Sequence, residues 1–536
     1  MKIRNHQSRR AGAFCLVKLF AAGLVFLKVA STAVAQDQQP WFGVQFPPPL
    51  SPNSIPVALG VRGPAPAVVP SGELEHNELR GERIFEDVER IVQFSWQSRE
   101  EEELGGDQLW GRVSGFPSSE RTVRWAADEL SMAGIGQIRV QEINQESDAS
   151  LWLPEQWEVR LLGSESFGKN SLDIILETAM ALAPSELPQG TVEAQIVYVG
   201  KATPAELMHI DVAGKIAIQH VTPQAHLVFE RGTAVPAARS LFEAGALAVL
   251  NLIDQPGNER VRDFSNCGGP CFNLGGQDSR FLLEVFNRAV QEGKAQELRM
   301  KLSLTSRNHS GLSATNAIAI IPGQSNKTII LNAHADAWFD GAGDNADGLA
   351  VMLALARHFA SQDVQLNHTL VFVVSAGHHT SGLNGPRNAV RMNPDLFDNA
   401  MLIFNLEHVA QRNIAPARFL YDDGYRQFTA DSYEAPIVVG ITNESRYLQE
   451  LFTKGVARYG TNFMSTESSM ASGEGGGYRS TSVPIVTTMQ APPLYHTSGE
   501  VAEIISVPGL ERMARFMAFF VSEVDKIELQ QLDTDD

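Results

Sequence analysis

Residues 328–359, TIILNAHADAWFDGAGDNADGLAVMLALARHF, decide the fold of this chain. The apolar run Thr328–Leu331 has the length and composition of a buried strand. From Gly348 to Phe359, apolar side chains recur at helical spacing. A glycine-rich turn containing Asp344 lies between the two. The pattern predicts a strand that ends at His334, a loop at the sheet edge, and a helix that begins close to Asp344.

His334 and Asp344 are in suitable places to bind a metal ion. In open α/β sheets, ligand sites collect at the carboxyl ends of the strands. Imidazole and carboxylate together suit zinc or a similar divalent ion. Asp336 follows His334 by two residues, so it can hydrogen-bond the other ring nitrogen, as partners of metal-binding histidines usually do. The stretch therefore predicts a metal site at the end of this strand.

The same residues resemble the co-catalytic zinc aminopeptidase family, which includes aminopeptidase S and glutamate carboxypeptidase. In that family, a His-x-Asp precedes a Gly-Ala-x-Asp-Asn-Ala-Ser-Gly turn whose aspartate bridges two metal ions. His334, Asp336 and the turn around Asp344 match this pattern, and only Asp347 departs from the usual small residue. The resemblance extends from about Leu109 to Phe520. It implies a site for zinc, with two ions and Asp344 as the bridging ligand.

The glutamate pair of that family is replaced here. In the family, the next strand precedes Glu-Glu-x-Gly-Leu-x-Gly, in which the first glutamate is the general base and the second is a metal ligand. In this chain residues 376–385 read AGHHTSGLNG, with one extra residue before Gly-Leu-x-Gly. The simplest alignment makes His378 the catalytic base and His379 a metal ligand, and imidazole can serve in both roles. A histidine beside two cations is a weak base, and the alternative is that both are polar loop residues.

The resemblance implies further ligands downstream. Glu407 directly follows the apolar run 402–406 and takes the place of a family aspartate; alone, it would more often be a helix cap or surface charge. His496 lies in a Tyr-His-Thr segment like that of the family. The implied centre has His334 and Glu407 on one metal ion, His379 and His496 on the other, and Asp344 as the bridge between them. If only one ion binds, its ligands would be His334, Asp344 and Glu407. Asp336 and Glu474 are candidates to hold the ligands through hydrogen bonds.

The amino-terminal residues have the features of an export signal. Basic residues precede a largely apolar segment, 12–30, and Ala33-Val34-Ala35 is a cleavage site of the A-x-A type. We predict a signal peptide over residues 1–35 and an exported protein, periplasmic or extracellular, with an uncleaved anchor as the alternative. Later segments are too short or too polar to span a bilayer.

Cleavage of the predicted signal removes six basic residues and no acidic ones, which changes the net charge from -19 to -25. This negative charge argues against binding to nucleic acid or anionic membranes.

Two cysteines remain after the signal, Cys267 and Cys271. In an oxidising compartment they can close a small disulfide loop. A metal site at this spacing would need further ligands nearby, and none is obvious. We therefore predict a disulfide.

The length of 536 residues predicts two or three domains. We expect an extended proline-rich segment over 36–75 and a short acidic tail over 526–536. Residues 76–165 and 311–525 should form a discontinuous α/β domain, a mixed sheet with helices on both faces. Residues 166–310 should form an insert that resembles the protease-associated domain, on the evidence of Gly214-Lys215 and Ala244-Gly245-Ala246 before apolar strands.

The resemblance implies a metal-dependent hydrolase that acts on peptide or related amide bonds, with His378 in place of the glutamate base. Zinc is the expected metal, although other first-row ions suit such a site. The alternative is a catalytically inactive, peptidase-like binding protein, because the lost glutamates would remove hydrolysis. A glutaminyl-cyclase-like acyl transfer uses the same scaffold, but it too needs a glutamate at the position of His378.

Overall fold

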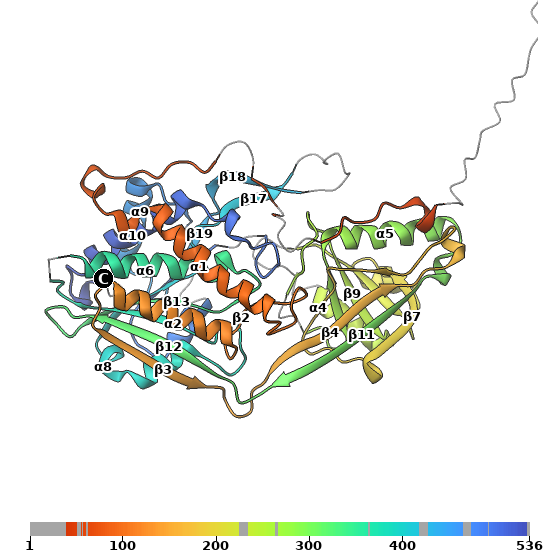
Figure 1. The fold of residues 1–536 in the computed structure, drawn as a ribbon, viewed down its shortest axis with the longest axis horizontal. Coiled ribbons are helices and arrows are strands. Elements are labelled where there is room, and N and C mark those ends of the chain that lie inside the picture. The colour runs from red at the N-terminus through yellow and green to blue at the C-terminus, as the bar shows by residue number, and fades with distance from the viewer. Residues whose placement is uncertain are drawn as a thin grey trace, which may run out of the picture.

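The computed structural model describes residues 39–50, 55, 57–59, 63–223, 234–262, 266–362, 365–417, 427–464, 473–490 and 493–532. These residues form two units, each built around its own eight-stranded sheet (Figure 1). The predicted signal peptide lies outside the described residues.

The first sheet is mixed, with parallel strands at its centre. Strand β13 (Thr328–His334) lies between β15 (Thr369–Ser375) and β16 (Ala400–Leu406) and is parallel to both. Strand β16 is also parallel to β21 (Ile485–Met489). The carboxyl ends of these four strands therefore lie along one edge of the sheet. The full order is β20-β19-β21-β16-β13-β15-β12-β3, in which the outer strands are β20 (Phe463–Met464), β19 (Ile437–Ile441), β12 (Ser313–Ile321) and β3 (Gln137–Asn144).

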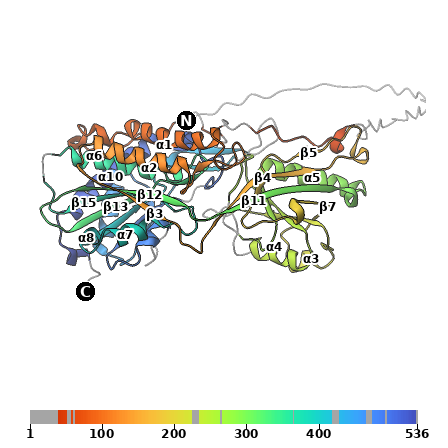
Figure 2. The ribbon, with the colours of Figure 1, turned by 60° about the horizontal axis from the view of Figure 1, so that its bottom comes forward.

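Helices cover both faces of this sheet, as Figure 2 shows. Helix α6 (Asp347–Ala360) is buried at twelve of its positions because it packs between the sheet and other helices. The predicted class, an α/β fold with helices on both faces of a mixed sheet, is confirmed. The face that carries α6 also carries α1 (Gly81–Glu100), α2 (Pro117–Met132), α9 (Arg446–Tyr459) and α10 (Val507–Val524). The opposite face carries α7 (Gly385–Met392) and α8 (Pro394–Phe397).

The second sheet is built from residues that lie between β3 and β12 in the chain. Since β3 and β12 pair with each other in the first sheet, the second unit is an insertion between two neighbouring strands. The expected boundary at residue 166 differs from the structure, because β4 (Leu151–Leu161) already pairs with β11 (Arg299–His309) in the second sheet. The alternation of β4 identifies it as a strand but does not identify its partner.

The second sheet has the order β5-β4-β11-β7-β8-β9-β10-β6. Its strands β7, β8, β9 and β10 are mutually parallel, which agrees with the strand and helix alternation expected there. A disulfide joins Cys267 and Cys271, whose Cα atoms are 6.3 Å apart. The remaining elements are β5 (Ile174–Ile175), β6 (Met180–Ala181), β7 (Thr191–Tyr198), β8 (Ile216–Val221), β9 (Ala248–Ile253), β10 (Cys271–Leu274), α3 (Pro204–Leu207), α4 (Ala234–Glu243) and α5 (Gly276–Gln291).

The proline-rich segment contacts both units. Trp41 stacks on Phe167 of the second unit, with ring centroids 5.5 Å apart. Further along, the oxygen of Pro66 accepts a hydrogen bond of 2.9 Å from Arg512 of α10. Short pairings complete the fold: a three-stranded sheet of β1 (Val57–Ala58), β18 (Phe428–Glu434) and β17 (Arg412–Pro416), and the pair β14 (Ala337–Trp338) with β2 (Gly111–Arg112).

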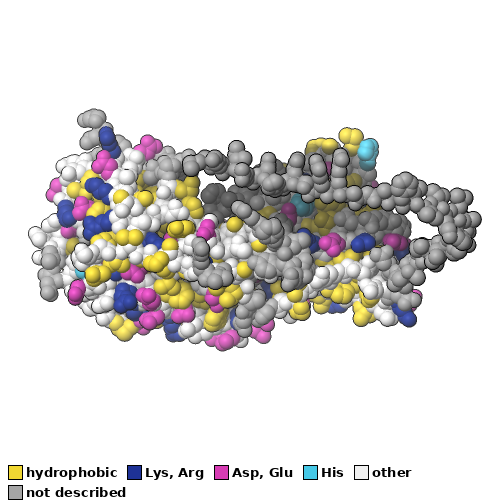
Figure 3. All heavy atoms as spheres, turned by 90° about the horizontal axis from the view of Figure 1, so that it is seen from above, with side chains coloured by type: hydrophobic (Ala, Val, Ile, Leu, Met, Phe, Trp, Pro, Cys, Tyr) yellow, Lys and Arg dark blue, Asp and Glu magenta, His cyan; other side chains and the backbone are white. Residues whose placement is uncertain are grey.

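Within the described ranges, no helix combines the length and apolar character that crossing a membrane requires. On the face in Figure 3, acidic and basic side chains are interspersed among apolar ones over the first unit.

Candidate metal centre

Five side chains that could bind metal ions meet at the carboxyl edge of the first sheet. His334 is the last residue of β13, and Asp344 lies in the turn before α6. His379 follows β15, His408 follows β16, and His496 follows β21. All five are buried.

The two carboxylate oxygens of Asp344 each face two histidines. Oδ1 lies 3.2 Å from Nε2 of His334 and 3.1 Å from Nε2 of His408. Oδ2 lies 2.9 Å from Nε2 of His496 and 3.3 Å from Nε2 of His379. Asp344 therefore lies between two pairs of imidazoles, as expected of a carboxylate that bridges two metal ions.

The ring orientations of two histidines fit metal binding. Nδ1 of His334 lies 3.0 Å from the backbone oxygen of Asp336, and Nδ1 of His408 lies 3.1 Å from the backbone oxygen of Gln490. A carbonyl oxygen only accepts, so each Nδ1 carries a proton and each Nε2 is directed toward Asp344. A metal ion bound at this point would take the place of the proton on Nε2. Donor atoms of His334, Asp344 and His379 lie within 4.8 Å of one another, so the residues fit a metal ion.

The electrostatics of the centre favour positive charge. Burial alone would lower the pKa of His408, but the charge of Asp344 raises it to about 9. Burial likewise opposes ionisation of Asp344, but the surrounding histidines, first His379 and His408, hold the pKa of this carboxyl well below its usual range. The anion at the middle of the site therefore stabilises any cation held among these rings.

His408, which the sequence analysis did not single out, lies at the same end of the centre as the predicted ligand Glu407, and ligand atoms of His334, Glu407 and His408 lie within 4.8 Å of one another. Oε1 of Glu407 accepts hydrogen bonds from Nδ2 of Asn405, at 2.9 Å, and from the backbone N–H of Glu474, at 2.6 Å, while its Oε2 has no hydrogen-bond partner among the described residues. The backbone of His408 has a φ of +49°, in the left-handed region, which interrupts the alternation of the strand. In the sequence, the only indication that His408 could be a ligand is that it is a second residue of a metal-binding type just after strand β16.

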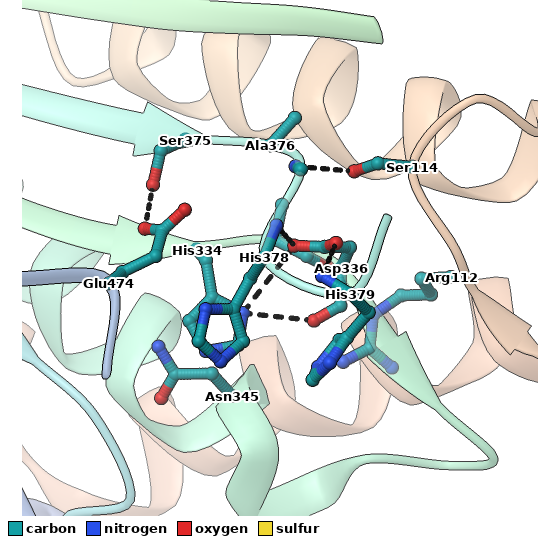
Figure 4. Close-up of polar contacts among 12 residues, drawn as sticks. Arg112, Ser114, His334, Asp336, Asn345, Ser375, Ala376, His378, His379 and Glu474 are labelled. Atoms are coloured by element: carbon teal, nitrogen blue, oxygen red, sulfur yellow. Dashed lines mark hydrogen bonds and ion pairs between the residues drawn. The ribbon is translucent and has the colours of Figure 1, made fainter. Parts of the chain in front are cut away.

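The His378–His379 loop is held by Asp336 (Figure 4). The carboxylate of Asp336 accepts the backbone N–H of His378 at 3.3 Å and that of His379 at 2.9 Å. Its Oδ1 is 3.6 Å from Nδ1 of His334, too far for the predicted side-chain hydrogen bond, and the backbone oxygen of Asp336 takes that role. Asp336 thus orients both histidine-bearing segments.

His378 is stacked on His334, with ring centroids 4.3 Å apart. Burial, together with the neighbouring His334 and His379, lowers the pKa of His378 well below its usual value. Its ring is therefore neutral, and the same lowering of its pKa makes it a weak base.

Glu474 enters the site from the turn Gly473–Tyr478. Its Oε2 accepts hydrogen bonds from the hydroxyl of Ser375 and from Nδ2 of Asn332, the latter at 2.9 Å. Its Oε1 has no hydrogen-bond partner among the described residues. Burial raises the pKa of Glu474 to about 8, so this carboxyl holds a proton at neutral pH.

The turn that carries Asp344 is fastened by Arg112, which is fully buried. Its guanidinium donates to the backbone oxygens of Ala335 at 3.1 Å, Asp340 at 2.6 Å and Gly341 at 3.1 Å. Gly341 has a φ of +52°, and a Cβ there would lie 2.3 Å from the Cβ of Ala337, so the turn requires glycine at this position.

Asp347, the departure from the family pattern, also has a structural role. Its Oδ2 accepts the backbone N–H groups of Val409, at 3.0 Å, and Ala410, at 2.7 Å. The carboxylate therefore ties the start of α6 to the segment after His408. A small residue could not make these bonds.

The centre opens into a cleft of about 610 Å³ between the two units. His378, His379 and Glu474 line it from the first unit, and Trp152 and Arg262 line it from the second. The backbone N–H of Arg262 also donates to the oxygen of His496 at 3.0 Å. The second unit thus forms one wall of the cleft and supports a candidate ligand.

Residues 316–521 match Peptidase family M28. The match covers less than half of the chain, but it includes Asp344 and the four histidines that surround it. No curated protein matches this sequence.

Several solved structures share the fold at low sequence identity. One is an aminopeptidase from Aneurinibacillus sp. strain AM-1, 18% identical over 84% of this chain and 95% of that chain, with a TM-score of 0.51. Another is a Peptidase M28 precursor from Shewanella amazonensis SB2B, 17% identical over 85% and 100%, with a TM-score of 0.58. A third is BSAP, a zinc aminopeptidase from Bacillus subtilis, 16% identical over 85% and 98%, with a TM-score of 0.55.

Proposed function

We propose that this protein is a metal-dependent hydrolase of the aminopeptidase type, acting on peptide or related amide bonds. The observation that carries the proposal is Asp344, each of whose carboxylate oxygens faces two histidine Nε2 atoms. We assign two zinc ions, one to His334 and His408 and the other to His379 and His496, with Asp344 shared. The match to Peptidase family M28 and the similarity in fold to zinc aminopeptidases support this assignment.

When bound, the metal ions would polarise the scissile carbonyl and lower the pKa of an attacking water. The chain itself supplies the groups that move protons. His378 lines the cleft with a neutral ring, so an uncharged ring nitrogen can take the proton of the water, and its lowered pKa means that it holds this proton weakly and releases it readily. Glu474 lines the same cleft with a protonated carboxyl because its pKa is raised, so it donates a proton to the leaving amine. Two titratable groups whose environments displace their pKa values in opposite directions suit a base and an acid.

The cleft sets the size of the substrate. Its volume of about 610 Å³ lies within the range of small-molecule sites, roughly 300–1,000 Å³, and suits a short peptide. The second unit, which we propose to be a protease-associated-like domain, limits access from one side. The export signal predicted over residues 1–35 supports a substrate outside the cytoplasm.

The test is hydrolysis of aminoacyl p-nitroanilides and short peptides by the purified mature protein. We expect activity that a chelator removes and zinc restores. Asp344→Asn should lose the zinc of the metal centre and the activity, while His209→Ala, at an exposed position of the second unit, should retain both. Bound zinc without hydrolysis of any substrate would favour the alternative, a binding protein on a peptidase scaffold. Failure to bind zinc at all would overturn the proposal.

A further inference from the structure

A second group of metal-binding side chains lies outside the cleft. His76 and Glu78 precede α1, and His358 lies in the last turn of α6. We call these three residues the rear cluster. Each offers one ligand atom, and the three atoms lie within 4.8 Å of one another. The rear cluster brings together segments about 280 residues apart in the chain.

Glu78 is the centre of the rear cluster. Its Oε1 lies 2.7 Å from Nδ1 of His358 and 3.6 Å from Nδ1 of His76. The two rings are nearly perpendicular, with centroids 4.7 Å apart. Two imidazole nitrogens thus converge on one carboxylate oxygen, the same ligand types that occur at each half of the metal centre.

The other ring nitrogen of His358 has a partner that can set its tautomer. Nε2 of His358 lies 2.7 Å from the amide nitrogen Nε2 of Gln362, one turn further along the chain. A half-turn of this amide places its oxygen against Nε2–H and leaves the lone pair of Nδ1 directed toward Glu78 and His76. Metal-binding histidines are usually held through the second nitrogen in this way.

The neighbouring cations do not occupy Glu78, so its carboxylate is available to bind a metal ion. A hollow of about 280 Å³ lies beside it, lined by His76 and His358 of the cluster and by the cations Arg458, Arg515 and Lys526. These cations have their own anionic partners, namely Glu73, Glu511 and Glu523. In the part of the chain that the structure describes, the only ion-pair partners of Glu78 are the two histidines. The hollow provides space for water to complete a coordination sphere.

We propose that the rear cluster binds one divalent first-row transition-metal ion through His76, Glu78 and His358. Two imidazoles and one carboxylate, with a position open to water, form a set that zinc accepts. The ion would join the segment before α1 to the carboxyl end of α6. Because α6 begins three residues after Asp344, the ion would fasten the far end of the helix that follows the metal centre. This site is independent of the proposed hydrolase activity.

The test compares the full chain with His76→Ala and Glu78→Gln, which alter partly exposed side chains, and with His209→Ala as a matched control at an exposed histidine. Each protein is equilibrated with excess zinc chloride, passed through a desalting column and analysed for zinc per chain. The zinc-induced rise in Tm is measured in parallel, because an ion that binds only the folded state raises Tm.

We expect both rear-cluster variants to hold one zinc per chain fewer than wild type and to show a smaller zinc-induced rise in Tm. His209→Ala should match wild type in both measurements. Equal zinc content and an equal rise in Tm in all four proteins would overturn the proposal. The readout is a difference between variants, so an empty metal centre would refute the proposed hydrolase without affecting this test.

Discussion

Replacing His408 by alanine should remove most of the affinity for one metal ion, whereas Glu407→Gln should have a much smaller effect. Nε2 of His408 lies 3.1 Å from Oδ1 of Asp344, and His334 is the other imidazole at that oxygen. Glu407 instead bonds to Asn405 and to the backbone of Glu474. The two neighbours in sequence therefore differ in whether they reach the bridging carboxylate.

The magnitude follows from these contacts. Loss of a residue that only orients a ligand typically lowers metal affinity by about 10- to 100-fold. Loss of His408 removes the ligand itself, so we expect a decrease of more than about 100-fold, or about 2.8 kcal/mol at 1.4 kcal/mol for each factor of ten. Glu407→Gln keeps an oxygen that can accept the same two hydrogen bonds. Its decrease in metal affinity should therefore not exceed the about 10- to 100-fold that is typical of a residue that only orients a ligand.

The assay is a zinc titration against a chelator of known affinity, together with elemental analysis of zinc per chain. His408→Ala should retain one tightly bound zinc fewer than wild type, and Glu407→Gln should retain the wild-type number. If His408→Ala binds zinc as wild type does while Glu407→Gln loses an ion, the assignment of ligands from this geometry is wrong. Circular dichroism of both variants would check that they fold alike.

Three further predictions concern proton transfer, the metal-binding turn and the second unit. His378→Ala should lower kcat by about 10²- to 10⁴-fold with zinc content unchanged. Since burial raises the pKa of Glu474 to about 8, the rate of the wild-type enzyme should fall above that pH. Glu474→Gln should be slow, and its pH–rate profile should lack this fall at alkaline pH. Arg112→Lys should destabilise the first unit by at least about 2 kcal/mol in urea unfolding, because an ammonium group can keep only one of the three bonds to carbonyls and each of the two lost bonds costs about 1 kcal/mol or more. Burial raises the pKa of Asp278 despite hydrogen bonds from Thr178, so the folded state binds this proton more tightly than the unfolded state. Its contribution to stability is therefore lost as pH rises through the folded pKa, and Asp278→Asn should remove that pH dependence from unfolding curves measured above pH 3.8; an unchanged dependence would contradict the reasoning.

Much of the first unit could be predicted because its signals are local. The apolar run at 328–331 and the helical spacing over 348–359 correspond to β13 (Thr328–His334) and α6 (Asp347–Ala360). The loop between them places Asp344 at the carboxyl edge of the sheet. Strand and helix formation depend on neighbouring residues, so the periodicity of a short segment carries the information.

The site was predicted less completely, because ligand orientation depends on contacts from other elements. The sequence placed His334 at the end of a strand and His379 after the next strand, and the family resemblance implied His496; the structure brings all three to Asp344. Alternation alone cannot show that Glu407 and His408 both offer ligand atoms near His334, or which of the two reaches Asp344. The left-handed backbone of His408 and the hydrogen bonds of Glu407 to Asn405 and Glu474 decide it.

By itself, the sequence determined the strand–turn–helix around Asp344 and the α/β class, because apolar periodicity and turn residues act over a few positions. Only the tertiary structure decided that β4 belongs to the second sheet, that His408 faces Asp344, and that Arg262 supports His496 across the cleft. Each of these depends on residues far apart in the chain, whose pairing is set by packing and hydrogen bonds that form only when the chain folds.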